Sequence, residues 1–317
     1  MLSLTLLLLA GCASEVASVL AGPLSAVVAR GYGLTEDGRV ASSSTHYSSC
    51  FIDCWDEPVY RPGGVFTQIS ASESAVCGAR ESGEVACWGA GGPIKLVDTD
   101  APPGVLSTSD HGACVLADGV VHWIAQAEYD GASPHLTGSD SSWAAVDCAK
   151  EEWNAAGGWG LDDAGAVWVA DEDGGTYEGA MPGGPFIAID GECALNTDGF
   201  LVCGTDYGGS YGAEPGEWFL RLEASESETM QSGPWSALRS RGSSPSRHDG
   251  WWGHCGRLED GDWECLDWTY EPGELRDIDI GHGIHGNVCT VDADGRGACW
   301  SPGGDFEGDD WYVDEAP

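Results

Sequence analysis

Cysteine is the residue type in this sequence whose chemistry is easiest to interpret. The chain of 317 residues has 13 cysteines, and in an oxidising compartment two neighbouring thiols join as a disulfide. Zinc sites place paired cysteines much closer together in sequence than the pairs found here, so we expect disulfides and no bound metal. Eight of the cysteines form four pairs with one spacing: Cys77 and Cys87, Cys193 and Cys203, Cys255 and Cys265, and Cys289 and Cys299.

Each of these pairs encloses a turn. A glycine lies six positions after the first cysteine in all four, and glycine adopts positive φ without steric cost. Apolar residues flank the turn, which predicts a β-hairpin. Folding the chain at the turn places the two cysteines directly opposite each other, where Cβ atoms are about 4.5–5.5 Å apart, close to disulfide geometry. The four glycines are Gly83, Gly199, Gly261 and Gly295.

The turn recurs in three further places without the cysteine pair, at Gly38, Gly119 and Gly165. The steps between successive turn glycines are 45, 36, 46, 34, 62 and 34 residues, and a recurring period in this range is typical of stacked or radially arranged units. A short apolar or alternating run precedes most of the hairpins, so each unit is expected to be one strand followed by a hairpin, as in a propeller blade. These runs span 65–71, 104–109, 142–148, 185–190 and 275–281.

Three segments of the repeat resemble a known family. "CGARESGEVACWG" (77–89), "ECALNTDGFLVCG" (192–204) and "HGNVCTVDADGRGACW" (285–300) are similar to the regulator-of-chromosome-condensation (RCC1-like) repeat. The resemblance implies an all-β, seven-bladed β-propeller over about residues 24–301. It also implies a ring closed by N- and C-terminal strands, the second from residues 310–315. The Gly-Gln-Leu-Gly segment of the repeat is absent here.

The N-terminal segment predicts export. Residues 2–10 are apolar but too short to span a bilayer, which is typical of a signal peptide. The following Leu9-Ala10-Gly11-Cys12 resembles the bacterial lipobox, although no positive charge precedes it. The prediction is a lipoprotein signal at 1–12, with Cys12 as the lipidated N-terminus and membrane contact only through its lipid, followed by the propeller at 13–317. The alternative is an ordinary secretory signal. Export also predicts disulfides at four further cysteines, with the pairing left open: Cys50, Cys54, Cys114 and Cys148.

The charge of the chain limits its partners. A formal net charge of −39 repels nucleic acid and anionic lipid, and suits solubility, a salty habitat or a basic partner. The step of 62 residues contains residues 221–250, which we interpret as an inserted loop and as a partner-binding element, because tryptophan and arginine are enriched at binding hot spots. A solvated loop without a partner is the alternative. The residues in question are Trp235, Arg239, Arg241, Arg247, Trp251 and Trp252.

No catalytic motif stands out. His282 and His285 lie where the repeat carries strand residues, which favours packing over metal binding. There is no phosphate-binding loop and no Gly-x-Ser-x-Gly segment. The expectation is a monomeric, cofactor-free, non-catalytic protein-binding module at the bacterial cell envelope. The nucleotide exchange known in the family is not expected, because no residues match that interface.

Two alternatives remain: a propeller hydrolase or lectin acting on glycans, and a purely structural envelope protein. The centre of the ring distinguishes the first alternative from a binding module. Carboxylates clustered with arginine there would favour the hydrolase, whereas apolar strands would favour the binder.

Overall fold

The computed structural model contains β-strands and no helix in the residues that it describes. No described segment could therefore cross a membrane as a helix. The described residues are 18–28, 31–43, 61–72, 75–89, 92–98, 103–109, 112–125, 142–148, 158–170, 176–178, 183–190, 193–199, 201–204, 219–222, 235–240, 254–258, 260–266, 274–280, 288–300 and 311–314.

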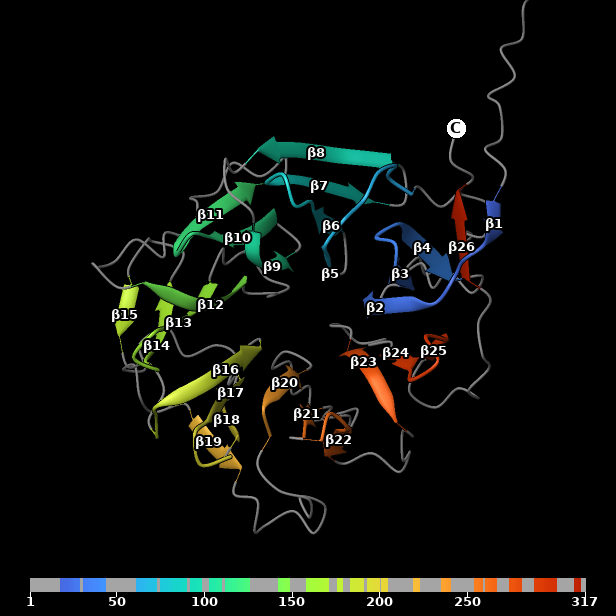
Figure 1. Cartoon of the computed structure of the whole chain (residues 1–317). Helices are drawn as coiled ribbons and strands as arrows, with labels where there is room; N and C mark the ends of the chain where they lie inside the picture. The colour runs from blue at the N-terminus through green and yellow to red at the C-terminus, as the bar shows by residue number, and fades with distance from the viewer. Residues whose placement is uncertain are drawn as a thin grey trace, which may run out of the picture.

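The strands form seven small antiparallel sheets around a common centre (Figure 1). The first sheet contains β1 (Ser18–Leu20), β2 (Leu24–Val28), β3 (Tyr32–Thr35), β4 (Val40–Ser43) and β26 (Trp311–Asp314). The second contains β5 (Gln68–Ala71), β6 (Val76–Ala79), β7 (Glu84–Gly89) and β8 (Gly92–Asp98). The third contains β9 (Pro103–Ser109), β10 (Gly112–Ala117) and β11 (Val120–Ala125).

The remaining four sheets follow in chain order. The fourth contains β12 (Trp143–Cys148), β13 (Gly158–Asp162), β14 (Val167–Ala170) and β15 (Thr176–Glu178). The fifth contains β16 (Phe186–Asp190), β17 (Cys193–Asn196), β18 (Leu201–Gly204) and β19 (Phe219–Leu222). The sixth contains β20 (Ala237–Ser240), β21 (His254–Arg257) and β22 (Trp263–Leu266), and the seventh contains β23 (Leu275–Ile280), β24 (Val288–Asp292) and β25 (Gly297–Trp300).

One strand of each sheet lies nearest the centre (Figure 1), and we call β2, β5, β9, β12, β16, β20 and β23 the inner strands. Each inner strand contacts the inner strand of the next sheet, and β23 contacts β2. Both ends of the chain contribute to the first sheet, because β26 pairs with β1 on one side and with β4 on the other. The last sheet and the first sheet are therefore neighbours, although they lie at opposite ends of the sequence.

The predicted turns are confirmed. All seven turn glycines have positive φ, which side chains other than glycine rarely adopt. The turn also holds the next sheet in place: the carbonyl oxygen of Gly38 accepts a hydrogen bond of 2.8 Å from the N–H of Phe66, just before β5. Gly165 does the same for Phe186, and Gly295 for Leu24. Each of these turns therefore packs against the start of the following inner strand.

The cysteine pairs lie directly opposite each other, as the hairpin prediction requires. The register pairs Cys77 with Cys87, Cys193 with Cys203, Cys255 with Cys265, and Cys289 with Cys299. Disulfides join Cys77 to Cys87 and Cys289 to Cys299, and Cys193 and Cys255 are each disulfide-bonded as well.

The structure shows part of the cysteine pairing that the sequence left open. Cys114 of β10 forms a disulfide with Cys148 of β12, which links the third sheet to the fourth. Both residues are buried. Cys12, Cys50 and Cys54 lie outside the described residues.

The two kinds of disulfide should contribute differently to stability. The double variant Cys114→Ala/Cys148→Ala removes a disulfide between cysteines 34 residues apart in sequence. Cys77→Ala/Cys87→Ala removes one between cysteines 10 residues apart. Because the entropy lost by the unfolded chain grows with loop length, we expect the first variant to lose about 1 kcal/mol more free energy of unfolding than the second. Urea unfolding of both variants and the oxidised parent checks this, and a larger loss for the hairpin pair would contradict it.

Candidate functional site

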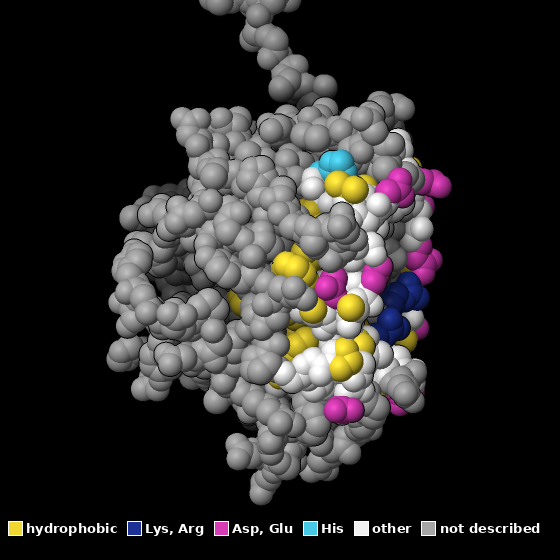
Figure 2. Space-filling view, turned by 90° about the vertical axis from the view of Figure 1, so that its left-hand side faces the viewer, with side chains coloured by type: hydrophobic (Ala, Val, Ile, Leu, Met, Phe, Trp, Pro, Cys, Tyr) yellow, Lys and Arg dark blue, Asp and Glu magenta, His cyan; other side chains and the backbone are white. Residues whose placement is uncertain are grey.

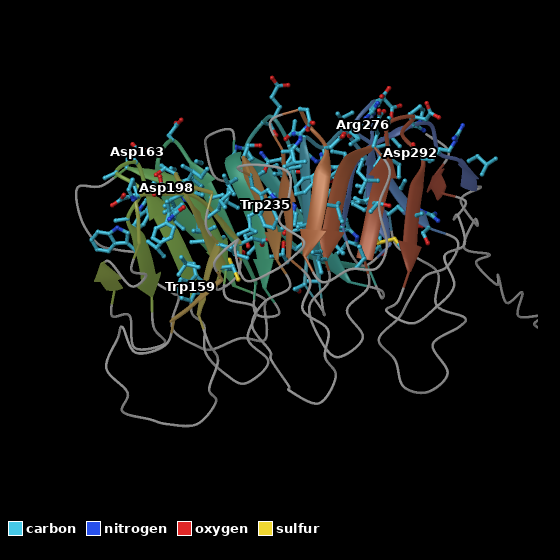
Figure 3. The ribbon with its side chains drawn as sticks, turned by 90° about the horizontal axis from the view of Figure 1, so that it is seen from below. Trp159, Asp163, Asp198, Trp235, Arg276 and Asp292 are labelled. Carbon is cyan, nitrogen blue, oxygen red and sulfur yellow. A yellow bond between two sulfur atoms is a disulfide. The ribbon has the colours of Figure 1, made fainter. Side chains whose placement is uncertain are left out.

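The tight turns gather on one face of the molecule, which we call the turn face. In Figure 3, Asp163, Asp198 and Asp292 lie along a single edge, together with Arg276. The turn in every sheet presents at least one exposed acidic side chain on this face. These are Glu36, Asp37, Glu81, Asp118, Asp163, Asp198, Asp260 and Asp294.

Arginines on the turn face pair with acidic neighbours and do not offset the excess of acid. Arg39 lies 2.9 Å from Asp37, and a hydrogen bond from the Thr35 hydroxyl lowers the pKa of Asp37, so that its carboxylate stays ionised. The other pairs are Arg80 with Glu84, Arg276 with Glu36, and Arg296 with Asp294. Figure 2 shows the described Asp and Glu side chains gathered on one side of the view, with Arg and Lys among them. The turn face is therefore negatively charged.

A few apolar side chains lie exposed among these acids. Val65 is 62% exposed and lies against the turn at Gly38, whereas Ile187 is 45% exposed and follows Phe186 at the start of β16. Val120, next to the turn glycine Gly119, is also exposed. Single exposed apolar side chains are common on protein surfaces, and these three add apolar area to the acidic turn face.

A second group of polar residues lies on the inner strands, and we call it the central cluster. The register aligns its members, because Asp190, Arg239 and Asp279 each lie opposite the first cysteine of their hairpin. Strands that converge on one centre therefore bring these side chains together. The cluster consists of Ser107 of β9, Asp147 of β12, Asp190 of β16, Arg239 of β20, and Asp277 and Asp279 of β23.

Several of these polar side chains join neighbouring sheets. The Cys148 N–H of β12 donates a hydrogen bond of 3.0 Å to the hydroxyl of Ser107 in β9, which itself donates to the carboxylate of Asp147. In the seventh sheet, Asp277 Oδ2 accepts a hydrogen bond of 3.1 Å from the Val27 N–H of β2. An inner strand has a free edge, so its N–H groups need acceptors from outside the sheet. The cluster therefore has a structural role between the inner strands.

In the central cluster, the charges of Arg239 and of the aspartates affect one another's pKa values. Burial alone would lower the pKa of the Arg239 guanidinium, but four carboxylates outweigh it and raise that pKa, with Asp277 contributing most. Burial raises the pKa of Asp277 to about 6, against the lowering effects of Arg239 and of the Val27 N–H. Arg239 also lies with its guanidinium carbon 5.9 Å from the ring centre of Trp263, a cation–π distance. Arg239 is the cation that permits several carboxylates to lie close together here.

The prediction of one inserted loop over 221–250 is wrong for the residues described. Ala237–Ser240 is strand β20, and β19 already covers residues 221 and 222. Trp235, interpreted above as a contact residue, is only 2% exposed and packs in the core with Leu238. Arg239 belongs to the central cluster.

Both errors have one physical reason, because β20 forms by pairing with β21 across a long insertion that hides its repeat position. Four other predicted site residues lie outside the described part: Arg241, Arg247, Trp251 and Trp252.

The central cluster was not predicted, although the sequence contains a signal for it. The runs at 142–148, 185–190 and 275–281 contain aspartates at matching positions near their ends, namely Asp147, Asp190 and Asp279. An aspartate inside an apolar run needs a partner when it is buried. His282 and His285 are outside the described residues, and among the residues that are described no three His, Cys, Asp or Glu side chains lie close enough together to hold a metal ion.

Comparison with known proteins identifies the fold. No family model and no curated protein matches the sequence. Among solved structures, the β-propeller domain of Cps50 (Swd1) from Myceliophteria thermophila superposes with a TM-score of 0.53 at 11% identity, covering 90% of this chain and 98% of that one. Human WBSCR16 gives a TM-score of 0.51 at 13% identity, covering 77% and 79%. Yeast RCC1 (Prp20), in complex with Kap60, gives 0.49 at 14% identity, covering 78% and 73%. The chain has a β-propeller fold, as the sequence predicted.

Proposed function

We propose that this protein is an exported, seven-bladed, RCC1-like propeller that binds a protein partner through its turn face and has no catalytic activity. The observation that carries the proposal is the turn face itself, on which every turn presents an exposed acid beside apolar side chains such as Val65 and Ile187. Because the turn face is acidic, charge complementarity favours a partner with a basic surface. Contacts between that partner and the exposed apolar side chains would add affinity.

The architecture suits this role. Positive-φ glycines hold the turns, and hydrogen bonds to the next inner strand hold those at Gly38, Gly165 and Gly295, so we expect little change in their conformation when a partner binds. Binding then needs little ordering of the chain, which reduces its entropic cost. The residues Arg241, Arg247, Trp251 and Trp252 stay candidates for an additional contact.

Export and lipidation are part of the same proposal. Buried disulfides such as Cys114–Cys148 support folding in an oxidising compartment. We place the protein at the bacterial cell envelope, held by lipid on Cys12 after removal of the signal. The variant Cys12→Ser should leave the membrane fraction for the soluble fraction, and membrane retention of this variant would contradict lipid anchoring.

The binding proposal is tested by reversing charge on the turn face. Deleting 221–250 is unsuitable, because it would remove β20. We expect the immobilised wild-type domain to capture one basic protein saturably from envelope extracts of its own source. The variant Glu81→Lys/Asp198→Lys should bind it at least tenfold more weakly, since both side chains are exposed and lie on the turn face.

The neutral variant Glu81→Gln/Asp198→Asn is the matched control, and it should bind with intermediate affinity. The differences should shrink at high salt, because exposed charges are screened. Equal capture by the wild type and the charge-reversed variant would place the contact elsewhere.

A glycan hydrolase is the second candidate, and the central cluster is the observation that favours it. Arg239 among four carboxylates is the arrangement that the sequence analysis assigned to the hydrolase. Asp277, with its pKa raised to about 6, has the character of a general acid next to other carboxylates. Incubation with a panel of envelope glycans tests this, with Asp277→Asn and Asp279→Asn as comparison variants. Absence of cleavage by the wild type would remove the candidate.

A further inference from the structure

Two adjacent residues of β23 hold the seventh sheet to the first, and we call this contact the seam. Arg276 Nη1 donates hydrogen bonds to the carbonyl oxygen of Leu24 (3.0 Å) and to Glu36 Oε1 (2.7 Å). Asp277 Oδ2 accepts one from the Val27 N–H (3.1 Å). A backbone hydrogen bond of 2.8 Å from the Leu24 N–H to Gly295 O completes the seam. These contacts join residues about 250 positions apart, so the seam joins the last sheet of the chain to the first.

Asp277 is a carboxylate in a type of contact between inner strands that an uncharged side chain makes elsewhere in the ring. Between the second and third sheets, the Thr108 N–H donates to the hydroxyl of Ser70 (3.1 Å), which carries no charge near neutral pH. At the seam the acceptor is a carboxylate instead, and it is partly buried. The contact between the first and last sheets is therefore one that can gain or lose a proton.

The charges facing Asp277 come from few elements. Arg239 of β20 favours its ionised form, Asp279 of its own strand disfavours it, and β2 contributes the backbone N–H of Val27. Arg276, next to it in sequence, is engaged with Glu36. Burial outweighs the attraction of Arg239, so the pKa of Asp277 rises to about 6. The protonated form of Asp277 is therefore favoured over the ionised form more strongly in the seam than in water.

We propose that the seam is a pH-responsive clasp, which is tight while Asp277 is protonated and loosens as Asp277 ionises. The sign follows from linkage, because opening the seam returns the carboxylate to water, where it ionises near pH 4. Raising the pH from well below 4 to above 7 therefore favours the open seam, by roughly a hundredfold in the ratio of open to closed molecules. This inference does not depend on the proposed partner binding or on catalysis.

Hydrogen exchange of single amides, followed by NMR on the full chain between pH 4.5 and 7.5, tests the clasp. Val27 reports on the seam, and Thr108 is the matched reference because its acceptor, Ser70, is neutral. After correction for the intrinsic rates, we expect the protection of Val27 to fall roughly 25-fold relative to that of Thr108 as the pH rises over this range. Equal pH dependence of the two amides in the wild type would overturn the proposal, and this comparison requires no variant.

Substitution gives the second arm of the test. In Asp277→Asn the relative protection of Val27 should no longer change with pH, because the amide cannot titrate but can still accept the hydrogen bond. Asp198→Asn, which removes an exposed carboxylate from the turn face, should behave as the wild type. A wild-type pH dependence in Asp277→Asn would also overturn the proposal, since another group would then be titrating.

Discussion

Replacing Gly256 with alanine is expected to destabilise the protein by about 3 kcal/mol, the upper end of what overpacking of a core produces. A Cβ atom at Gly256 would lie 1.6 Å from Cδ2 of the Trp235 indole, far inside any van der Waals contact. Trp235 is buried and is one of the largest side chains in the core, so moving it would disturb its packing. Either the indole or strand β21 must shift.

Gly63→Ala is the matched control, because nothing lies within 4 Å of a Cβ atom there and its φ is unexceptional. It should unfold at nearly the same urea concentration as the wild type. The double variant Trp235→Leu/Gly256→Ala should be less destabilised than the sum of its single changes, since the smaller side chain relieves the clash. If Gly256→Ala proves as stable as Gly63→Ala, the packing of Trp235 on Gly256 is wrong.

The same arrangement recurs in other sheets, which makes the prediction general. A Cβ atom at Gly78 would meet the ring of Phe66 at 2.7 Å, and one at Gly160 would meet Trp143 at 2.4 Å. An aromatic residue at or just before the start of an inner strand thus packs on a glycine of the neighbouring strand. We expect Gly160→Ala to be destabilising for the same reason.

Replacing Arg239 with methionine is expected to reduce the free energy of unfolding by about 3 kcal/mol at pH 7.5, because it leaves partly buried carboxylates without their cation. Methionine keeps much of the length of the side chain but not its charge. Without Arg239 the pKa of Asp277 should rise further, since the attraction that now opposes burial is removed. A carboxyl group whose pKa is higher in the folded state destabilises that state only while it is ionised, so the loss should shrink as the pH falls towards 4.

Urea unfolding of Arg239→Met at several pH values checks both the size and the sign of this effect. Arg296→Met is the control, because the side chain of Arg296 is 77% exposed and its ion pairs with Asp292 and Asp294 are weak. It should change stability little at any pH. A loss for Arg239→Met that is constant from pH 4 to 7.5 would show that packing, and not charge, is what Arg239 contributes.

Much of the fold was predictable because its units are local. A turn glycine with positive φ and two cysteines ten residues apart determine a hairpin without help from the rest of the chain, and Gly199 with Cys193 and Cys203 show this. The apolar runs before the hairpins also became inner strands, as at 185–190 and 275–281. Repetition of the unit then indicated a ring, and the comparison with solved propellers agrees.

The tertiary structure decided which side chains meet. Trp235 and Arg239 were predicted to belong to a loop because a long insertion separates β20 from its pairing partner. Only the arrangement of the sheets places Trp235 in the core and Arg239 among four aspartates. The partner of Cys114 likewise lies in the next sheet.

The difference between what was predicted and what was not comes from how far along the chain each kind of interaction acts. Turn and strand preferences act over a few residues, so the sequence by itself determined the hairpins, their opposed cysteines and their repetition. Contacts such as Asp277 with Val27 arise only when seven sheets are arranged around one centre, which brings together residues that no local pattern connects.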